Sequence, residues 1–266
     1  MRIVFLLLLS LTLFSSERIV TLSPAIAEIV SGLGESKHIV GVSDYTLYPP
    51  QLSERPKVGG YTTLSLERTL ALKPNLVIGL PYQEEFLTKL KHFGIKTKTL
   101  RLGSTQEIKS AIFQLGEQLK QPKAAQTMIQ TIDYAKSSAA HNENNDSVLV
   151  VFASSSSLSR GVYVAGHDLF FEEILKSCHT HNAYRDNYNM QPIMSIENII
   201  ASNPDQVLLL LGPLDNVDPM SVKREWMKLP VKAAKDHKIT IIQNDYILIP
   251  SQRIAKSITT ICEVLK

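Results

Sequence analysis

A pattern of polar and apolar positions occurs twice along the chain. Residues 64–80 read LSLERTLALKPNLVIGL, and residues 194–210 read MSIENIIASNPDQVLLL. At a constant offset of 130 positions the two segments are identical at six positions, which indicates an internal repeat. The identical pairs are Ser65 and Ser195, Glu67 and Glu197, Ala71 and Ala201, Pro74 and Pro204, Val77 and Val207, and Leu80 and Leu210.

Each copy predicts a short helix, a tight turn and a buried strand. A serine stands at the N-cap position, and a glutamate follows in the first turn, where unpaired backbone N–H groups favour a carboxylate. A proline ends the helix because it cannot continue the backbone hydrogen bonds, and it biases the residue before it towards extended geometry. The apolar runs 76–80 and 207–211 then have the length of strands buried on both faces. We therefore expect an α/β protein with two similar lobes and a cleft between them.

The rest of the chain fits around these two lobes. Residues 17–104 are expected to form the amino-terminal lobe, and residues 147–266 the carboxy-terminal lobe. Between them, residues 105–146 have helical periodicity, with a break at Gln121–Pro122 and a long linking helix over 123–140. A single helical connection offers few residues that could act as a hinge, so we expect small domain movement on binding.

The amino-terminal residues 1–16 have the pattern of a secretory signal peptide. Arg2 gives a short positive region, residues 3–14 form a predominantly apolar region, and Ser15 and Ser16 are small. An apolar region of twelve residues is too short to span a bilayer comfortably. The pattern predicts export to the periplasm.

The composition is that of a globular protein, with 44% apolar and 20% charged residues. The formal net charge of +3 is small, and the basic residues form no block, so nothing favours nucleic acid as a partner. The sequence also lacks a nucleophile elbow, a phosphate loop, a zinc-protease motif and a dinucleotide-binding motif. We therefore expect a protein that is not an enzyme.

Cys178 and Cys262 are the only two cysteines. In an oxidising compartment an even pair favours a disulfide, and two buried free thiols are the alternative. A third hypothesis is a metal site, and with it a metal-dependent enzyme, built on Cys178, His179 and His181, because these side chains are common zinc ligands. Spacing alone does not supply a fourth ligand.

Tyrosines are frequent in the segments that follow the predicted strands, where ligands bind in α/β sheets. Tyrosine combines a large apolar face with one polar tip, which suits a bulky planar ligand, although some of these rings could only pack loops onto the lobes. The candidates are Tyr45, Tyr48, Tyr61, Tyr82, Tyr163, Tyr188 and Tyr246.

Glu67 and Glu197 have two interpretations. They either stabilise their helices, or they supply one exposed carboxylate per lobe that docks onto basic pockets of a partner.

Five segments together resemble the periplasmic substrate-binding proteins of ABC importers for cobalamin and ferric siderophores, with the cobalamin branch most similar. The segments are ERIVTLSPAIAEIVSGLG (17–34), VGVSDYTLYPP (40–50), the two repeat copies, and NDYILIPSQRIAKSITTICEVL (244–265). The resemblance implies a class III binding protein: two lobes joined by one long helix, with a bulky chelate, cobalamin or an iron chelate such as a ferric siderophore or haem, held in a cleft. It also implies a permease partner in the membrane. We expect a monomer without a cofactor of its own.

The resemblance extends to individual residues. The family's two docking glutamates match Glu67 and Glu197, and the two cysteines of the cobalamin branch match Cys178 and Cys262, which supports the disulfide. Aromatic ligand contacts of that branch match Tyr48, Tyr61 and Tyr246, and Arg253 matches a further residue of it. Leu80 and Gln191 depart from the pattern, since the cobalamin branch has tryptophan at both positions. Siderophore binders often use arginine, for which the candidates are Arg160, Arg185 and Arg253.

Overall fold

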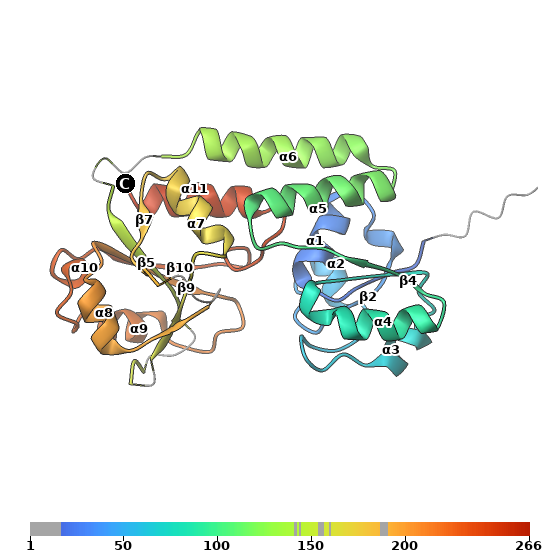
Figure 1. The fold of residues 1–266 in the computed structure, drawn as a ribbon, viewed down its shortest axis with the longest axis horizontal. Coiled ribbons are helices and arrows are strands. Elements are labelled where there is room, and N and C mark those ends of the chain that lie inside the picture. Colours follow the sequence, from blue (N-terminus) through green and yellow to red (C-terminus); the bar gives the residue numbers. More distant parts are fainter. Residues whose placement is uncertain (1–16, 141–142, 144, 154–156, 160, 187–190) are drawn as a thin grey trace, which may run out of the picture.

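The computed structural model describes residues 17–140, 143, 145–153, 157–159, 161–186 and 191–266. The predicted fold is confirmed: two α/β lobes lie side by side, and helices join them along one side of the molecule (Figure 1). The expected signal peptide, together with Tyr188 and Arg160, lies outside the described residues. Within the described part of the chain, no helix is both long and apolar enough to span a membrane.

The amino-terminal lobe is built on a four-stranded parallel sheet in the order β2-β1-β3-β4. Every residue of β1 and β3 is buried, because parallel strands are covered by helices on both faces. The strands are β1 (Ile19–Thr21), β2 (Ile39–Val42), β3 (Leu76–Gly79) and β4 (Lys96–Thr99). The helices are α1 (Pro24–Gly32), α2 (Pro50–Ser53), α3 (Leu66–Ala71) and α4 (Glu84–His92), with 3-10 turns at Ser36–His38 and Pro81–Gln83.

The carboxy-terminal lobe has a mixed six-stranded sheet in the order β10-β9-β5-β6-β8, and β7 pairs with β5. Strands β5, β7, β9 and β10 run parallel, whereas β6 is antiparallel to β5 and β8. The strands are β5 (Ser147–Phe152), β6 (Val162–Val164), β7 (His181–Asn182), β8 (Ile193–Met194), β9 (Gln206–Leu211) and β10 (Ile239–Gln243). The helices are α7 (Phe170–Ser177), α8 (Ile196–Ser202), α9 (Pro219–Trp226), α10 (Lys232–Lys235) and α11 (Ile254–Val264).

The repeated segments form the same unit in both lobes, α3 followed by β3 and α8 followed by β9. The serine at each N-cap accepts a hydrogen bond from the backbone N–H three residues on, at 3.2 Å in α3 and 3.3 Å in α8. One detail differs from the prediction. The residues before the two prolines, Lys73 and Asn203, are left-handed, with φ of 47° and 41°, and not extended. The chain therefore turns sharply at that residue, before the proline prevents the helix from continuing.

Two antiparallel helices, α5 (Thr105–Gln118) and α6 (Pro122–Ser137), make up the expected linking segment. Helix α5 covers the amino-terminal lobe, and α6 runs back across both lobes to pack on α11 (Figure 1). The expected linking helix over 123–140 is thus α6, which begins at Pro122 and ends three residues earlier than expected, at Ser137. Gly116 permits the close approach of the two helices, because a Cβ there would lie 2.4 Å from the Cβ of Ala125.

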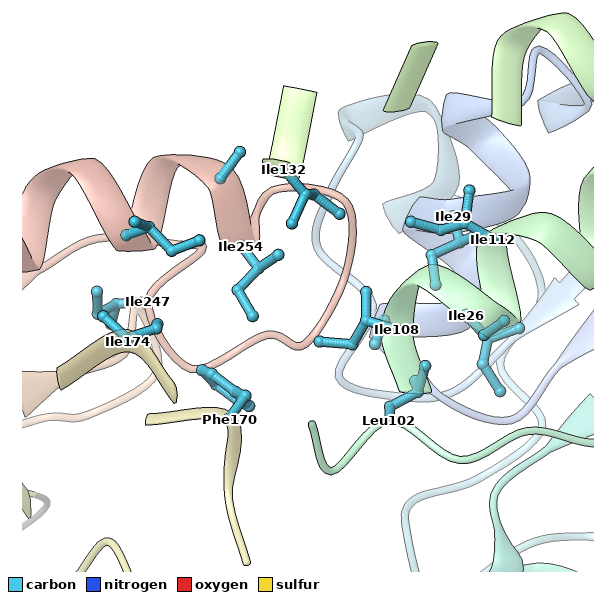
Figure 2. Close-up of a cluster of buried hydrophobic side chains, with 14 of the residues drawn as sticks. Ile26, Ile29, Leu102, Ile108, Ile112, Ile132, Phe170, Ile174, Ile247 and Ile254 are labelled. Atoms are coloured by element: carbon cyan, nitrogen blue, oxygen red, sulfur yellow. The ribbon is translucent and has the colours of Figure 1, made fainter. Parts of the chain in front are cut away.

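A continuous hydrophobic core connects the two lobes beneath α6 (Figure 2). It includes Ile26 of α1, Ile108 of α5, Ile132 of α6, Phe170 of α7 and Ile254 of α11. All five side chains are buried. Because this core is shared, moving one lobe against the other would expose apolar surface.

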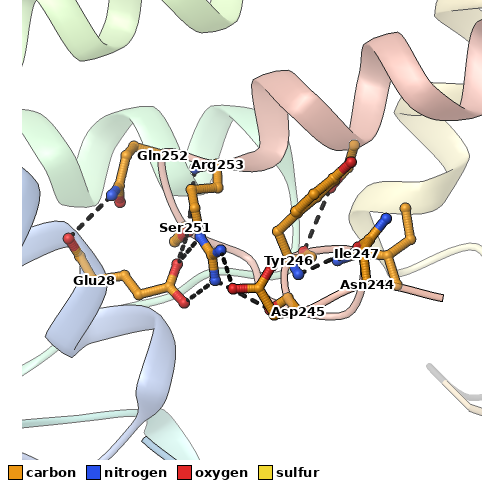
Figure 3. A network of polar contacts seen from close by, with 9 residues as sticks. Glu28, Asn244, Asp245, Tyr246, Ile247, Ser251, Gln252 and Arg253 are labelled. Atoms are coloured by element: carbon orange, nitrogen blue, oxygen red, sulfur yellow. Dashed lines mark hydrogen bonds and ion pairs between the residues drawn. The ribbon is translucent and has the colours of Figure 1, made fainter. Parts of the chain in front are cut away.

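A buried ion pair also joins the lobes (Figure 3). Arg253, at the start of α11, donates from Nε to Glu28 Oε2 of α1 at 2.9 Å and from Nη1 to Asp245 Oδ2 at 2.7 Å. Its second terminal nitrogen also donates to Glu28, so the contact is bidentate. Ser251 Oγ donates to the same carboxylate. Burial raises the pKa of Glu28, although the hydrogen bonds from Arg253 and Ser251 act in the opposite direction. We call this group the inter-lobe clamp.

Cys178 and Cys262 form a disulfide between the end of α7 and α11, with a Cα–Cα distance of 5.0 Å. Both residues are buried. The bond excludes the alternatives of free thiols and of a Cys178 thiolate that binds metal. Among the described residues, no group of three histidine, cysteine, aspartate or glutamate side chains is arranged to hold a metal ion.

The inter-lobe clamp should contribute strongly to stability. Replacing Arg253 with alanine leaves Glu28 buried without its charge partner, and this should lower the free energy of unfolding by about 3–5 kcal/mol. Urea denaturation followed by circular dichroism measures it. The matched control is Arg101→Ala, which removes a solvent-exposed ion pair with Glu107 and should change the free energy of unfolding far less. Equal losses in the two variants would contradict a special role for the clamp.

The disulfide should stabilise the chain mainly by restricting the unfolded state, since it closes a loop with a sequence separation of 84. The double variant Cys178→Ala and Cys262→Ala should lose roughly 2–5 kcal/mol of unfolding free energy. Chemical denaturation of the wild-type protein with and without reductant measures the stability contributed by the cross-link alone. The packing contribution of the two sulfur atoms is then the remaining loss in the double variant. A reduced wild type as stable as the oxidised protein would show that the cross-link contributes nothing.

Candidate ligand-binding cleft

Three adjoining cavities lie between the lobes. The central cavity, of about 430 Å³, is lined from both lobes by apolar and aromatic side chains. It shares Tyr61 with a cavity of about 250 Å³ beside the inter-lobe clamp, which we call the clamp-side cavity. It shares Tyr82 with a third cavity of about 810 Å³, which we call the polar-side cavity. The three form one cleft.

A row of tyrosines forms the wall of this cleft on the amino-terminal lobe. The rings of Tyr45 and Tyr61 are stacked, with centroids 4.8 Å apart, and Tyr82 meets the edge of Tyr61 at 6.4 Å. All three rings are exposed. Tyr45 follows β2 and Tyr82 follows β3, as the sequence predicts, whereas Tyr61 lies in the loop between α2 and α3 and not at a strand end.

A glycine places Tyr61 in this row. Gly59 has a φ of 123°, and a Cβ at that position would lie 2.2 Å from the carbonyl oxygen of Thr63. Only glycine adopts such a backbone without strain. The tight loop that follows presents Tyr61 to both the central and the clamp-side cavity.

The phenol groups of Tyr61 and Tyr82 stay protonated at physiological pH. Desolvation raises the pKa of Tyr82 to about 12, and the neighbouring Tyr61 adds to the effect. The pKa of Tyr61 is raised as well, first by desolvation and then by Tyr45. These two residues therefore offer neutral aromatic faces and hydroxyl groups to a ligand.

The opposite wall comes from the carboxy-terminal lobe. Tyr163 of β6 lines the central cavity, together with Phe152 at the end of β5 and Phe170 at the start of α7. Sequence reasoning missed both phenylalanines, because in an apolar run they resemble core residues. Their position at the carboxyl end of a strand and at a helix start is the signal that could have found them. Leu80 and Gln191, which depart from the cobalamin pattern, also line this cavity.

Three further predicted contacts lie on the clamp side. Tyr48 lines the clamp-side cavity, with the guanidinium of Arg253 only 3.8 Å from its ring centroid. Arg253 itself is 7% exposed and engaged with Glu28 and Asp245, so it holds the wall in place. The structure places Tyr246 against α11, where its hydroxyl group hydrogen-bonds Thr260 Oγ1 at 3.0 Å. The reason is local, since Asn244 Oδ1 accepts hydrogen bonds from the backbone N–H groups of Tyr246 and Ile247.

The two repeat glutamates lie away from the cleft. Glu67 is in the first turn of α3 and Glu197 in the first turn of α8, and both are exposed. Helices α3 and α8 belong to different lobes and lie on the side of the molecule away from α6 (Figure 1). The hydrogen bond with Ser195, and then one with its own backbone, lowers the pKa of Glu197. One carboxyl side chain per lobe is thus presented to solvent.

Comparisons with known proteins agree with this architecture. The chain is 29% identical over 252 residues to the vitamin B12-binding protein of Vibrio campbellii, covering 93% of this chain and 89% of that protein. It is 27% identical over 237 residues to the vitamin B12-binding protein of Salmonella choleraesuis, covering 86% and 85%.

Solved structures show the same fold. The apo periplasmic haem-binding protein of Roseiflexus sp. RS-1 has a TM-score of 0.79 at 23% identity, covering 94% of this chain and 98% of that one. The periplasmic vitamin B12-binding protein of Vibrio cholerae has a TM-score of 0.76 at 21% identity, covering 94% and 96%. The profile of the periplasmic binding protein family matches residues 19–246. The chain therefore belongs to the periplasmic binding protein family, whose members are substrate-binding proteins of importers and not enzymes.

Proposed function

We propose that this protein captures cobalamin in the periplasm and delivers it to an ABC permease. The observation that carries the proposal is the tyrosine row along an apolar cavity that both lobes line. Stacked neutral rings suit the face of a large macrocycle, and the loops can contact its edge. The vitamin B12-binding proteins of Vibrio and Salmonella, which match most of the chain, support the same ligand.

An iron chelate, either haem or a ferric siderophore, is the second candidate. It is favoured by the haem-binding proteins among the similar folds, such as that of Roseiflexus. Of the arginines expected to bind an anionic chelate, Arg253 is held in the inter-lobe clamp. Arg185 lies on an exposed segment apart from the three cavities. The positions of these two arginines therefore support cobalamin over an anionic chelate as the ligand.

Calorimetric titration of residues 17–266 with cyanocobalamin tests the ligand. We expect saturable one-to-one binding. Tyr61→Ala should weaken it about 10- to 30-fold, because the ring lies at the centre of the aromatic wall and lines two cavities. Tyr134→Ala is the matched control, since this ring is 72% exposed on α6, and it should change nothing. Binding of haem or a ferric siderophore without cyanocobalamin would move the proposal to the second candidate.

We further propose that Glu67 and Glu197 dock the loaded protein onto the permease. Each is an exposed carboxylate near a helix start, one in each lobe, and a charged pair of this kind can meet two basic pockets of a partner. The expected signal peptide is compatible with this role, because capture and docking both take place outside the inner membrane.

The double variant Glu67→Ala and Glu197→Ala should abolish cobalamin uptake in cells while ligand affinity of the purified protein stays unchanged. The control is Glu85→Ala with Glu225→Ala, which also removes one exposed carboxylate from each lobe. Glu85 pairs with Lys89 on the same helix, and Glu225 pairs with Lys228 just after the end of α9. Both glutamates lie outside the repeat. Normal uptake in the first variant, or equal loss in the control, would remove the docking assignment.

A further inference from the structure

The cleft is the acidic part of a weakly basic chain. Among the described residues that line the three cavities, seven are carboxylates and two are lysine or arginine. Two more cations stand directly behind the lining, Arg253 beside Glu28 and Lys136 beside Glu173. Counting all four cations, the cleft still has a formal charge of −3, whereas the whole chain has +3.

The charges are confined to the two ends of the cleft. The central cavity is lined by uncharged side chains. The clamp-side cavity has Glu28, Asp215 and Asp245, and Arg253 is shared between two of these carboxylates. A macrocycle that stacks on the central tyrosines would therefore present its edges to the charged ends.

At the polar-side cavity the cations are already paired. Arg101 donates to Glu107 at 2.6 Å, and Lys176 lies 3.3 Å from Glu172. Lys136 lies 3.4 Å from Glu173. Asp168 adds a further carboxylate to this wall. An anionic group on a ligand would thus have to displace a protein carboxylate before it could pair with a cation here.

From this charge distribution, and resting on the proposed function, we infer that the cleft selects its ligand by charge. It accepts a neutral chelate fringed with amide groups and rejects chelates with a carboxylate at the edge. Amide N–H groups donate to the wall carboxylates without a charge of their own. Carboxylates, such as the propionates of haem, are repelled by the same groups, and like-charge juxtaposition is an effective way to exclude a wrong partner.

Cyanocobalamin and its monocarboxylic acid isolate this effect. The acid differs by one peripheral amide hydrolysed to a carboxylate, so shape is kept and one negative charge is added. At pH 7.5 and low ionic strength the acid should bind about three- to tenfold more weakly. At 0.5 M salt the difference in affinity between the two corrinoids should fall below about twofold, because the Debye length falls from about 10 Å at 0.1 M to a few ångströms. A lost hydrogen bond alone would not depend on salt in this way.

Variants that remove negative charge from the wall of the polar-side cavity provide a second test. Glu172→Gln combined with Glu173→Gln keeps shape, removes two negative charges and frees Lys176 and Lys136. The affinity ratio of cyanocobalamin to its acid should fall towards one. Glu225→Gln is the matched control, a carboxylate of α9 paired with Lys228, and it should leave both affinities as in the wild type. Equal binding of both corrinoids by the wild-type protein at low salt would overturn the inference and leave the proposed function standing.

The inference can also be tested if cyanocobalamin itself does not bind. In that case the proposed ligand fails, and haem is compared with its neutral diamide on the same preparation. The diamide should bind several-fold more tightly at low salt, and the Glu172→Gln and Glu173→Gln variant should reduce the difference. Haem binding as tightly as its diamide would overturn charge selection independently of the corrinoid result.

Discussion

Arg253 and Glu28 meet across the lobe boundary, and the geometry of the cleft depends on that contact. A bidentate guanidinium–carboxylate pair fixes both distance and angle, and burial removes the water that would compete for it. The same arginine lies over Tyr48, so one side chain positions the first helix of one lobe and an aromatic residue of the wall. The shared core and α6 keep the remaining surfaces of the lobes in register.

Local patterns in the sequence predict much of this architecture. The repeat predicts the two lobes, the N-cap serines predict where α3 and α8 begin, and Tyr82 lines the central cavity from the segment that follows β3. The inter-lobe clamp was beyond such reasoning. Its partners are 225 positions apart, and nothing in the neighbourhood of Arg253 indicates which carboxylate it will meet. Arg253 therefore seemed to be a ligand contact, because an isolated arginine gives the same sequence signal in both roles.

The assignment of aromatic residues shows the same limit. Tyr246 follows β10, and the turn held by Asn244 directs its side chain towards α11, whereas Tyr163 lies within β6, whose pleat directs its side chain into the cleft. Phe152 and Phe170 are missed because apolar surroundings are typical of core residues, and Phe170 does belong to the buried core while it also lines the central cavity. The direction of a side chain in a loop is set by one or two hydrogen bonds. The periodicity of apolar residues in the sequence contains no information about these bonds. The chemistry of a cleft is therefore harder to predict than its location.

The stiffness of the link between the lobes has a consequence at the membrane. Two lobes that share a core and a buried ion pair are expected to keep nearly the same spacing when empty and when loaded. Under the proposed docking, helices α3 and α8 would then present one unchanging footprint, and a membrane partner that recognised only this footprint would be occupied by empty molecules. Productive delivery would instead require the cargo to be sensed directly. Unloaded protein would then act as a competitor, and the ratio of protein to cargo would set the import rate.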